Sequence, residues 1–590
     1  MNITAVATLT FVVVIALIIA FVTRPRGDST VDFYLAGRRV GVLTNSWAIC
    51  GDYISAASFL GVAAAVYLFG IDGAWYAVGF AAGFIPVLLL IAAPLRRFGE
   101  FSLADFLGRR LRSEGVRLTA AGMVQIIILG YLIPQSVGGG ITWQLLVGHG
   151  LFGLSPYVTG VVVSLLVIAV VVAFGGMRGA TWYQAVQFIV VLLALIWLAS
   201  VAVAGGFDYG DAVRDLSKEP LTSPAHTSEG WELRTQADRI DPDRDAVFGQ
   251  PGAQYTQLGQ IALVVTLGLG TAGLPHVMNR YFTAPSGRAA RTTTVWVLGL
   301  IGAFYALAVM MGTAARHVIP DAVAEHPWLE ELTVDGVLIT PEHALPALGR
   351  IYGGELGLGI ISAAALIAVM STVAGLLLAA AATWGHDVYE RHVNPQATPR
   401  QAVWAGRLIT LMVAALAAGA AIVLSPGDLG PSTPALVTTM VTWAFAVAGC
   451  ALTPVLLLAI WWRRTTAAGA VVGMLLGGGG AAAALLIAET MPASPFRDLL
   501  AAPTLICAPL AGLAAVLVSR ATQPPRDVDA AWVTMHGTAS DRRAERLARL
   551  IAAAPSRGVG QESRADSRRE IDDDGSEEKG RRTQLRGRRR

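Results

Sequence analysis

The apolar stretch from Thr44 to Gly61, TNSWAICGDYISAASFLG, contains a carboxylate and several small polar residues. A charged side chain deep in a bilayer is costly, so Asp52 in the middle of a membrane span predicts a functional site. Gly51 and its small polar neighbours weaken a helix at this point, which would free backbone carbonyls to act as ligands. The stretch therefore predicts a broken transmembrane helix that binds a cation.

A second set of oxygen ligands lies in the sequence AALIAVMSTVAG. Ala368, Ser371 and Thr372 stand at i, i+3 and i+4, which places one carbonyl and two hydroxyls on one face of a helix. Oxygen ligands of this kind suit a weakly held monovalent cation. The alternative is that both hydroxyls bond to their own helix or join two helices.

The elements that must position these residues are transmembrane helices. The chain has 590 residues, of which 54% are hydrophobic and 14% charged, and its mean hydropathy is +0.57. A soluble chain carries about a quarter charged residues, so this composition indicates a polytopic membrane protein. Cys50, Cys450 and Cys507 lack metal-ligand spacing and predict neither a disulfide framework nor a zinc site. The sequence shows no nucleotide loop, metal cluster or nucleophile arrangement, so no enzyme activity is expected.

Stretches of roughly twenty apolar residues predict about thirteen transmembrane helices. Basic residues follow the first of them instead of preceding it, which predicts an uncleaved helix with the N-terminus outside. The predicted limits are 4–22, 44–69, 73–94, 118–146, 157–175, 180–204, 257–282, 293–315, 353–383, 402–424, 434–461, 467–488 and 500–519.

The charges of the loops agree with this count. Loop 95–117 has six arginines against three acids and is predicted inside. Loop 205–256 has ten acids against five bases and is predicted outside. Because a missed span would invert every later loop, this agreement also predicts a cytoplasmic C-terminus.

The spans divide into one leading helix (1–30), ten core helices (31–465) and two trailing helices (466–520), followed by a disordered basic tail (521–590). The second and seventh spans run in opposite senses, as an inverted five-plus-five repeat requires. The seventh span carries a second irregularity, GLGTAGLP from Gly268 to Pro275. Two interrupted helices in corresponding positions of the two halves are typical of the substrate site of a transporter.

Five motifs follow one another in the chain: FYLAGRR (Phe33–Arg39), GDYISAASFLG (Gly51–Gly61), FGGMRGATW (Phe174–Trp182), GTAGLPHVMNRYFT (Gly270–Thr283), and MSTVAG with HDVYERHVNP (His386–Pro395). In this order they resemble the sodium:solute symporter family over about residues 30–520. Within that family, GDYISAASFLG together with GTAGLPH is most similar to the acetate and short monocarboxylate permeases.

The resemblance implies the LeuT-like fold, an all-α membrane bundle built on a five-plus-five inverted repeat. It also implies a sodium site between the first and eighth core helices, and no cofactor other than the transported sodium ion. Carried over by position, the backbone carbonyl ligands would be Gly51, Ile54 and Ala368, and the hydroxyl ligands would be Ser371 and Thr372.

Asp52 departs from the family pattern. The proline-transporting members carry an aspartate one residue later, where this chain has Tyr53, so Asp52 does not inherit that aspartate's role. One interpretation gives Asp52 a part in cation attraction, protonation or coupling. The other is that its carboxylate bonds the free amides of the broken helix.

The resemblance also bears on the substrate. Galactose-transporting members place an acid and an amide where this chain has Ala57 and Ser58, which disfavours a sugar and allows a smaller, mostly apolar substrate. A carboxylate would be held by half-helix N-termini and by exposed amides, which the turn at Gly270–Gly273 is predicted to supply. Arg280 is expected to extend toward lipid phosphates at the inner boundary, with contact to the leaving carboxylate as the alternative. The expected substrate contacts are Ser55, Ala57, Ser58, Gln135, Thr271 and Ala272, with helix-to-helix bonding as the alternative for Gln135.

The implied function is a secondary symporter of the bacterial inner (plasma) membrane. It would import an acetate-like monocarboxylate with sodium by alternating access. Another small solute, such as pyruvate, propionate or an amino acid, and proton coupling through Asp52 stay open. A symporter-like membrane sensor is the second alternative, although the tail of 70 residues is too short and polar for a kinase. No nucleic-acid partner is expected, and the sequence does not indicate an oligomeric state.

Overall fold

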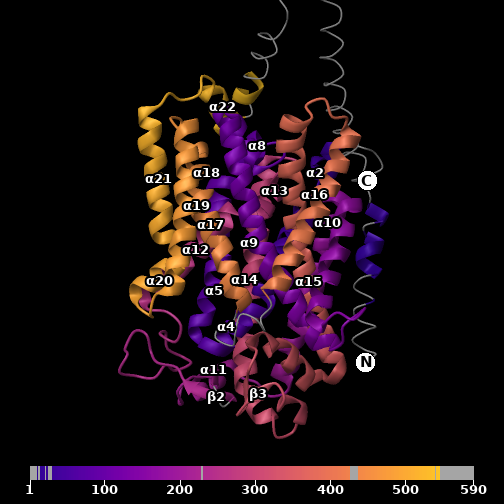
Figure 1. Cartoon of the computed structure of the whole chain (residues 1–590), viewed down its shortest axis with the longest axis vertical. Coiled ribbons are helices and arrows are strands. Elements are labelled where there is room, and N and C mark those ends of the chain that lie inside the picture. The colour runs from indigo at the N-terminus through magenta and orange to yellow at the C-terminus, as the bar shows by residue number, and fades with distance from the viewer. Residues whose placement is uncertain are drawn as a thin grey trace, which may run out of the picture. The chain divides into compact units, whose positions relative to one another are not determined.

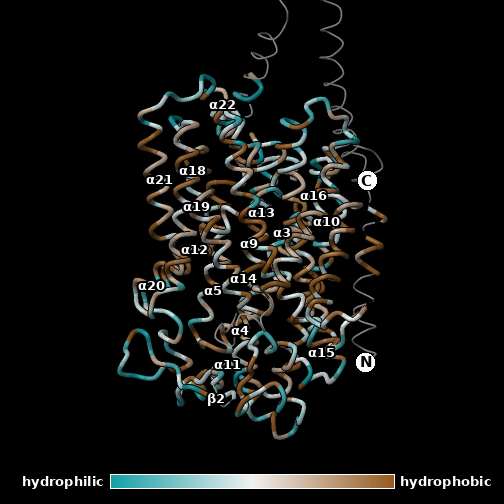
Figure 2. The backbone as a smooth tube through the Cα atoms, in the orientation of Figure 1, coloured by the Kyte–Doolittle hydropathy of each residue, from teal (hydrophilic) through white to brown (hydrophobic). Residues whose placement is uncertain are grey.

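The computed structural model describes residues 10, 14–19, 21–23, 29–227, 230–424, 436–538 and 540–544. The described residues up to His536 form one helical bundle. Residues 537–590 form a second unit, whose described part contains a short helical segment at 540–544. Figure 2 shows hydrophobic residues along the middle of the bundle and hydrophilic residues in the segments at its ends, as expected for a protein that spans a bilayer.

The first part of the chain, up to α11, contains only helices among its described residues (Figure 1). Its elements are α2 (Thr30–Leu35), η1 (Ala36–Arg38), α3 (Val42–Tyr53), η2 (Ala57–Gly61), α4 (Val62–Phe69), α5 (Ile71–Ala82), α6 (Phe84–Pro86), η3 (Val87–Ile91), α7 (Ala92–Phe98), α8 (Leu103–Leu111), α9 (Glu114–Val147), α10 (Pro156–Ala204) and α11 (Tyr209–Leu216).

The second part adds two small antiparallel hairpins to further helices. Its elements are β1 (Thr222–Thr227), β2 (Gly230–Thr235), α12 (Gln257–Gly273), α13 (Pro275–Tyr281), α14 (Gly287–Ala322), η4 (Pro327–Leu329), β3 (Thr333–Val334), β4 (Val337–Leu338), η5 (Pro341–His343), α15 (Ala344–Ala382), η6 (Thr383–Val393), α16 (Pro399–Val423), α17 (Leu436–Ala451), α18 (Thr453–Trp461), α19 (Ala467–Thr490), α20 (Pro495–Ala501), α21 (Thr504–Ala521) and α22 (Val528–His536).

The longer helices begin at side-chain caps that the sequence provides. A hydroxyl at the N-cap accepts a hydrogen bond from a backbone amide that would otherwise lack a partner in the first turn. The capping residues are Ser113 for α9, Ser155 for α10, Thr256 for α12, Ser286 for α14, Thr398 for α16 and Thr466 for α19.

Two helix pairs are bent at a short break, and both lie where the sequence predicts an interruption. The segment Val42–Tyr53 meets Ala57–Phe69 at 70°, and Gln257–Gly273 meets Pro275–Tyr281 at 49°. Each pair is long and apolar enough to form one membrane span. The prediction of two interrupted helices, one in each half of the core, is therefore confirmed.

The helix α10 has 49 residues, which would extend about 74 Å if it were straight, far more than the ~30 Å thickness of a bilayer. Gly176 interrupts it with φ 56° and ψ −156°, a conformation that residues with a side chain rarely adopt. The interruption lies between the predicted spans 157–175 and 180–204.

Among the described residues, nine helices are long and apolar enough to cross a membrane, or up to eleven if each bent pair is one span. In that count α10 is a single helix, although Gly176 divides it. The predicted leading span 4–22 falls largely outside the described residues. The total of about thirteen spans therefore stays a prediction.

The middle of α15 is almost entirely buried. This helix packs against α3, α9, α10, α14 and α16, so residues on every side of it face protein. A helix in this position places its polar side chains against other helices instead of lipid.

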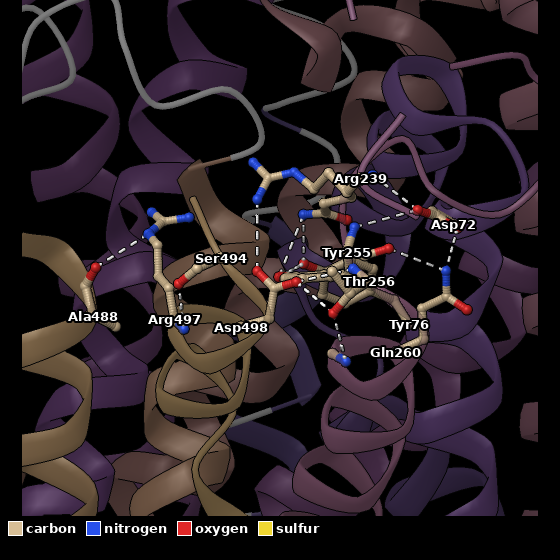
Figure 3. A network of polar contacts seen from close by, with 12 residues as sticks. Asp72, Tyr76, Arg239, Tyr255, Thr256, Gln260, Ala488, Ser494, Arg497 and Asp498 are labelled. Carbon is tan, nitrogen blue, oxygen red and sulfur yellow. Dashed lines mark hydrogen bonds and ion pairs between the residues drawn. The ribbon is translucent and has the colours of Figure 1, made fainter. Parts of the chain in front are cut away.

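The long loop 205–256 is fastened to the bundle by two buried carboxylates (Figure 3). Asp72 on α5 accepts hydrogen bonds from the amides of Gly252 (3.2 Å) and Gln254 (2.8 Å). Asp498 on α20 accepts from the amide and the hydroxyl of Thr256, both at 2.9 Å. These bonds satisfy backbone donors at the start of α12 and so fix the entry of the second broken helix.

Helix α22 lies within the predicted basic tail and packs on the bundle. Its Met535 carbonyl accepts a hydrogen bond from Arg97 (2.9 Å), and Asp529 pairs with Arg463 (3.1 Å). The sequence did not lead us to expect this helix. The division of the chain at 30, 465 and 520 stays a prediction, and the tail beyond residue 544 lies outside the described residues.

Candidate functional site

The first break lies at the end of α3. The helix continues through Gly51 and Asp52 to Tyr53, and Ile54 then leaves the helical conformation with φ −74° and ψ 102°. The last carbonyls of a helix have no partner within it, so those of this turn are available to other groups. The predicted interruption therefore lies within this stretch, but Gly51 itself is helical and the chain breaks three residues after it.

Gly51 has a different role in the structure. A side-chain carbon at this position would collide with the backbone carbonyl of Gln184 on α10. Glycine therefore allows α3 and α10 to approach closely at the level of the break.

The five predicted sodium ligands lie at the end of α3, where Ile54 directly follows the helix, and on α15. The Ser371 hydroxyl donates a 2.5 Å hydrogen bond to the Gly51 carbonyl, and the Thr372 hydroxyl donates a 3.4 Å bond to the Ile54 carbonyl. Ala368 is buried one turn before Ser371 on α15. The structure thus brings four of the oxygen-bearing groups into direct contact, while their role as sodium ligands stays a prediction.

Asp52 is fully buried and paired with an arginine. Its Oδ2 atom lies 3.2 Å from Nε of Arg280, and its Oδ1 atom accepts a 3.1 Å hydrogen bond from Nε2 of Gln184. Arg280 is 1% exposed, so the expectation that it extends toward lipid phosphates is wrong. The reason is that α13 packs among α3, α9 and α15, where a buried guanidinium requires a partner of opposite charge.

The remaining donors of Arg280 join α13 to α10, and Gln184 extends the connection to α15. The Nη1 atom of Arg280 donates to the Thr181 hydroxyl (2.8 Å), and its Nη2 atom donates to Oε1 of Gln184. Gln184 also donates from Nε2 to the backbone carbonyl of Ser371 at 2.9 Å. The ion pair of Asp52 and Arg280 is therefore connected through one glutamine to the helix that carries the two hydroxyls.

The second break is at Leu274, between α12 and α13. Thr271 and Ala272 lie in the last turn of α12, so the predicted exposed amides at Gly270–Gly273 belong to a helix instead of a turn. The Thr271 hydroxyl lies 2.7 Å from the Tyr53 hydroxyl. This contact joins the two broken helices near their breaks.

The predicted substrate contacts on the first broken helix bond to protein neighbours. The Ser58 hydroxyl lies 2.8 Å from the Tyr305 hydroxyl, and the Ser58 amide donates to Ser55 Oγ at 3.3 Å. Gln135 Oε1 accepts a 3.0 Å hydrogen bond from the amide of Ala56, the first residue after the break. Ala57 is buried within η2. The side-chain oxygen of Gln135 thus bonds α9 to the broken helix, which is the alternative to substrate contact considered from the sequence.

Two buried groups near this point lack a hydrogen-bond partner among the described residues. They are Nε2 of Gln135 and both ring nitrogens of His276. The His276 ring packs against the ring of Tyr131 with centroids 5.4 Å apart, and Gln135 follows Tyr131 by one turn of α9. His276 was not among the predicted contacts, although its place directly after the second break could have indicated it.

Comparison with known proteins agrees with these features. A family model described as "Sodium:solute symporter family" matches residues 33–477. The monocarboxylic acid transporter of Corynebacterium glutamicum is 33% identical over 461 residues, which are 76% of this chain and 77% of the relative. The uncharacterized symporter YwcA of Bacillus subtilis is 31% identical over 465 residues, or 78% of this chain and 81% of the relative.

The fold is also found in a solved structure. A Na+-coupled sialic acid symporter in a substrate-bound outward-open state matches with a TM-score of 0.66 at 16% identity, over 88% of this chain and 98% of that one. The likeness shows that the bundle is LeuT-like. The chain therefore belongs to the sodium:solute symporter family, and it is a sodium-coupled symporter of a small solute and not an enzyme.

Proposed function

We propose that this protein imports a small monocarboxylate of the acetate type together with sodium, by alternating access. The observation that carries the proposal is the direct contact of the Ser371 and Thr372 hydroxyls with the Gly51 and Ile54 carbonyls. The carboxylate class is supported by the similarity to the Corynebacterium relative, which is named a monocarboxylic acid transporter. The membrane would be the bacterial plasma membrane, with the N-terminus outside and the C-terminus in the cytoplasm.

In this proposal sodium takes the place of two hydrogen bonds. Both hydroxyls now donate to carbonyls, and rotation of each hydroxyl would turn its oxygen lone pairs toward an ion between α3 and α15. Gly51, Ile54, Ala368, Ser371 and Thr372 would then provide oxygen ligands from both helices. A sodium ion that moves down about 100 mV contributes roughly 2.3 kcal/mol to accumulation of the substrate.

The substrate carboxylate would bind at the groups that lack partners. Nε2 of Gln135 is a buried donor, and His276 offers a ring nitrogen beside Tyr131. A buried donor without a partner is costly, and an anionic acceptor would satisfy it. The short apolar part of the substrate would contact the aromatic rings of Tyr131 and Phe445, whose centroids lie 5.7 Å apart.

The other predicted contacts would complete this site. Ser55, Ser58 and Thr271 carry hydroxyls at the two breaks, and Ala57 and Ala272 leave room there because their side chains are small. Because Ser58 and Thr271 bond to tyrosines, they would position Tyr305 and Tyr53 as well as contact the substrate.

Asp52 would serve coupling through its ion pair. The carboxylate holds Arg280 on the second broken helix, and Gln184 links the pair to the backbone of Ser371. Movement of either broken helix would therefore be transmitted to the proposed sodium ligands. The partners of the carboxylate are side chains and not the amides of the broken helix, so this arrangement supports the coupling interpretation.

Uptake of radioactive acetate into proteoliposomes tests the proposal. An inward sodium gradient should drive accumulation above equilibrium, whereas an equal choline gradient should not. A proton gradient applied without sodium separates the two coupling ions. Equal uptake under every imposed cation gradient would refute the coupling, and no competition by short carboxylates would refute the substrate class.

The His276→Gln variant tests the substrate site. We expect the apparent KM for acetate to rise about tenfold, while sodium binding to the protein without substrate stays unchanged. The matched control is His392→Gln, since His392 lies on η6 and pairs with Glu114. An unchanged acetate KM in His276→Gln would remove this residue from the site.

A further inference from the structure

A buried group of two carboxylates and one imidazole lies outside the transport site. Asp105 belongs to α8, and His386 and Asp387 belong to the π-helical segment η6 that continues α15. One ligand atom of each residue lies within 4.8 Å of the others, and all three residues are buried. Figure 1 shows α8 toward the same end of the bundle as α22.

The surrounding residues hold the three side chains in place. His386 Nδ1 lies 2.9 Å from Oδ1 of Asp387, and the His386 ring stacks on Phe101 with centroids 4.0 Å apart. Ser102 donates its hydroxyl hydrogen to Asp387 and accepts from the Asp105 amide at 2.9 Å. Contacts of this kind orient metal ligands and limit the reorganisation that binding requires.

Asp105 has an incomplete set of partners. Neither of its carboxylate oxygens accepts a hydrogen bond from a described residue, although the side chain is fully buried. The nearest cationic atoms belong to Arg117 (3.6 Å), Arg391 (3.8 Å) and Arg109 (3.9 Å). A buried carboxylate in these surroundings is costly unless a cation approaches more closely.

Other acids compete for the same arginines. Arg109 lies 2.6 Å from Glu100, much closer than to Asp105, and Arg117 lies 3.5 Å from Glu114. Glu390 has a buried oxygen without a hydrogen-bond partner among the described residues. The group then has five acids and three arginines, an excess of two negative charges before the histidines are counted: Asp105, Asp387, Glu100, Glu114 and Glu390 against Arg109, Arg117 and Arg391.

We propose that Asp105, His386 and Asp387 bind a divalent transition-metal cation of the Zn²⁺ class. Imidazole nitrogen and carboxylate oxygens are ligands that Zn²⁺, Co²⁺ and Mn²⁺ accept, and a charge of two would balance the group. The ligand atoms must draw together by about 1 Å, because Zn²⁺ binds such ligands at about 2.0–2.2 Å. The bound ion would join α8 to the end of the helix that carries Ser371 and Thr372 and would slow transport.

Binding of Co²⁺ to the purified full-length protein tests the site. The visible absorption of Co²⁺ reports coordination by protein, and titration with Zn²⁺ should displace it. We expect Asp105→Asn and His386→Gln each to weaken binding about 100-fold. The matched control is His149→Gln, an exposed histidine outside this group, which should leave the affinity unchanged. The readout is independent of the transport proposal, because it needs neither substrate nor sodium.

A surface variant keeps the test decisive if the buried variants fail to fold. Arg391 is 40% exposed on its side chain, and its loss removes a positive charge 3.8 Å from Asp105. Arg391→Gln should therefore strengthen Co²⁺ binding roughly tenfold. The proposal is overturned if wild-type protein gives no Co²⁺ absorption. It is also overturned if binding is the same in Arg391→Gln, or in folded Asp105→Asn and His386→Gln.

Discussion

The buried ion pair of Asp52 and Arg280 makes a quantitative prediction. Asp52→Asn removes the carboxylate charge and leaves the guanidinium of Arg280 buried without an anion. Arg280→Gln leaves the Asp52 carboxylate buried without a cation. The double variant removes both charges, and we expect it to be more stable than either single variant.

The magnitude follows from the geometry of the pair. At 3.2 Å and an effective dielectric constant of about 20, two unit charges attract by about 5 kcal/mol. Loss of one partner from a buried pair typically destabilises a protein by about 3–5 kcal/mol, because the other charge stays buried. Arg280 also loses its bond to Thr181, so Arg280→Gln should be the more damaging single change.

The assay is thermal unfolding of the purified protein in detergent, followed by fluorescence, together with sodium-driven uptake in proteoliposomes. The two single variants should unfold at clearly lower temperature than wild type, and the double variant should recover roughly half of the loss. Arg178→Gln is the matched control, since Arg178 is an exposed arginine on the same helix as Thr181.

Additive losses in the double variant would refute the reasoning, because independent sites add and coupled ones do not. Recovery of stability without recovery of uptake would show that the charges serve coupling as well as folding. Full uptake in Asp52→Asn at normal stability would contradict the proposed coupling role of the pair.

Three further predictions concern the same helices and the loop. Ser371→Ala and Thr372→Ala should each raise the sodium concentration for half-maximal uptake about tenfold and the acetate KM less, with Thr372→Ser retaining more affinity. Gly375→Ala should lower the unfolding temperature in detergent, because the added carbon would collide with Asp52 Oδ1. Asp72→Asn should speed proteolysis within residues 236–256, because a neutral amide accepts hydrogen bonds from the loop's backbone amides more weakly than the carboxylate does.

Much of the fold was predictable because it depends on local composition. Apolar runs long enough to span a bilayer, with charged loops between them, determine helices and their order. The two breaks were found because glycine, proline and small polar residues interrupt those runs. The exact break points were not predicted. Gly51 and Gly273 are helical in the structure, and the chain turns at Ile54 and Leu274.

The contact between hydroxyls and carbonyls was expected from helical spacing together with the family resemblance. Spacing places Ser371 and Thr372 on one face of a helix, but it does not say which helix that face meets. The burial of α15 on all sides and the close approach to Asp52 that Gly375 permits decide that they meet α3.

The sequence by itself determined a helical membrane protein, two interrupted spans and the residue types of a cation site. Only the tertiary structure decided the partners of the charged residues. Arg280 lies near the end of an apolar segment, a position from which its side chain could reach either lipid headgroups or the protein interior. The packing of α13 places it in the interior, beside Asp52. Asp105 and His386 likewise meet only through folding, because long-range pairing depends on how helices pack and leaves no local pattern in the chain.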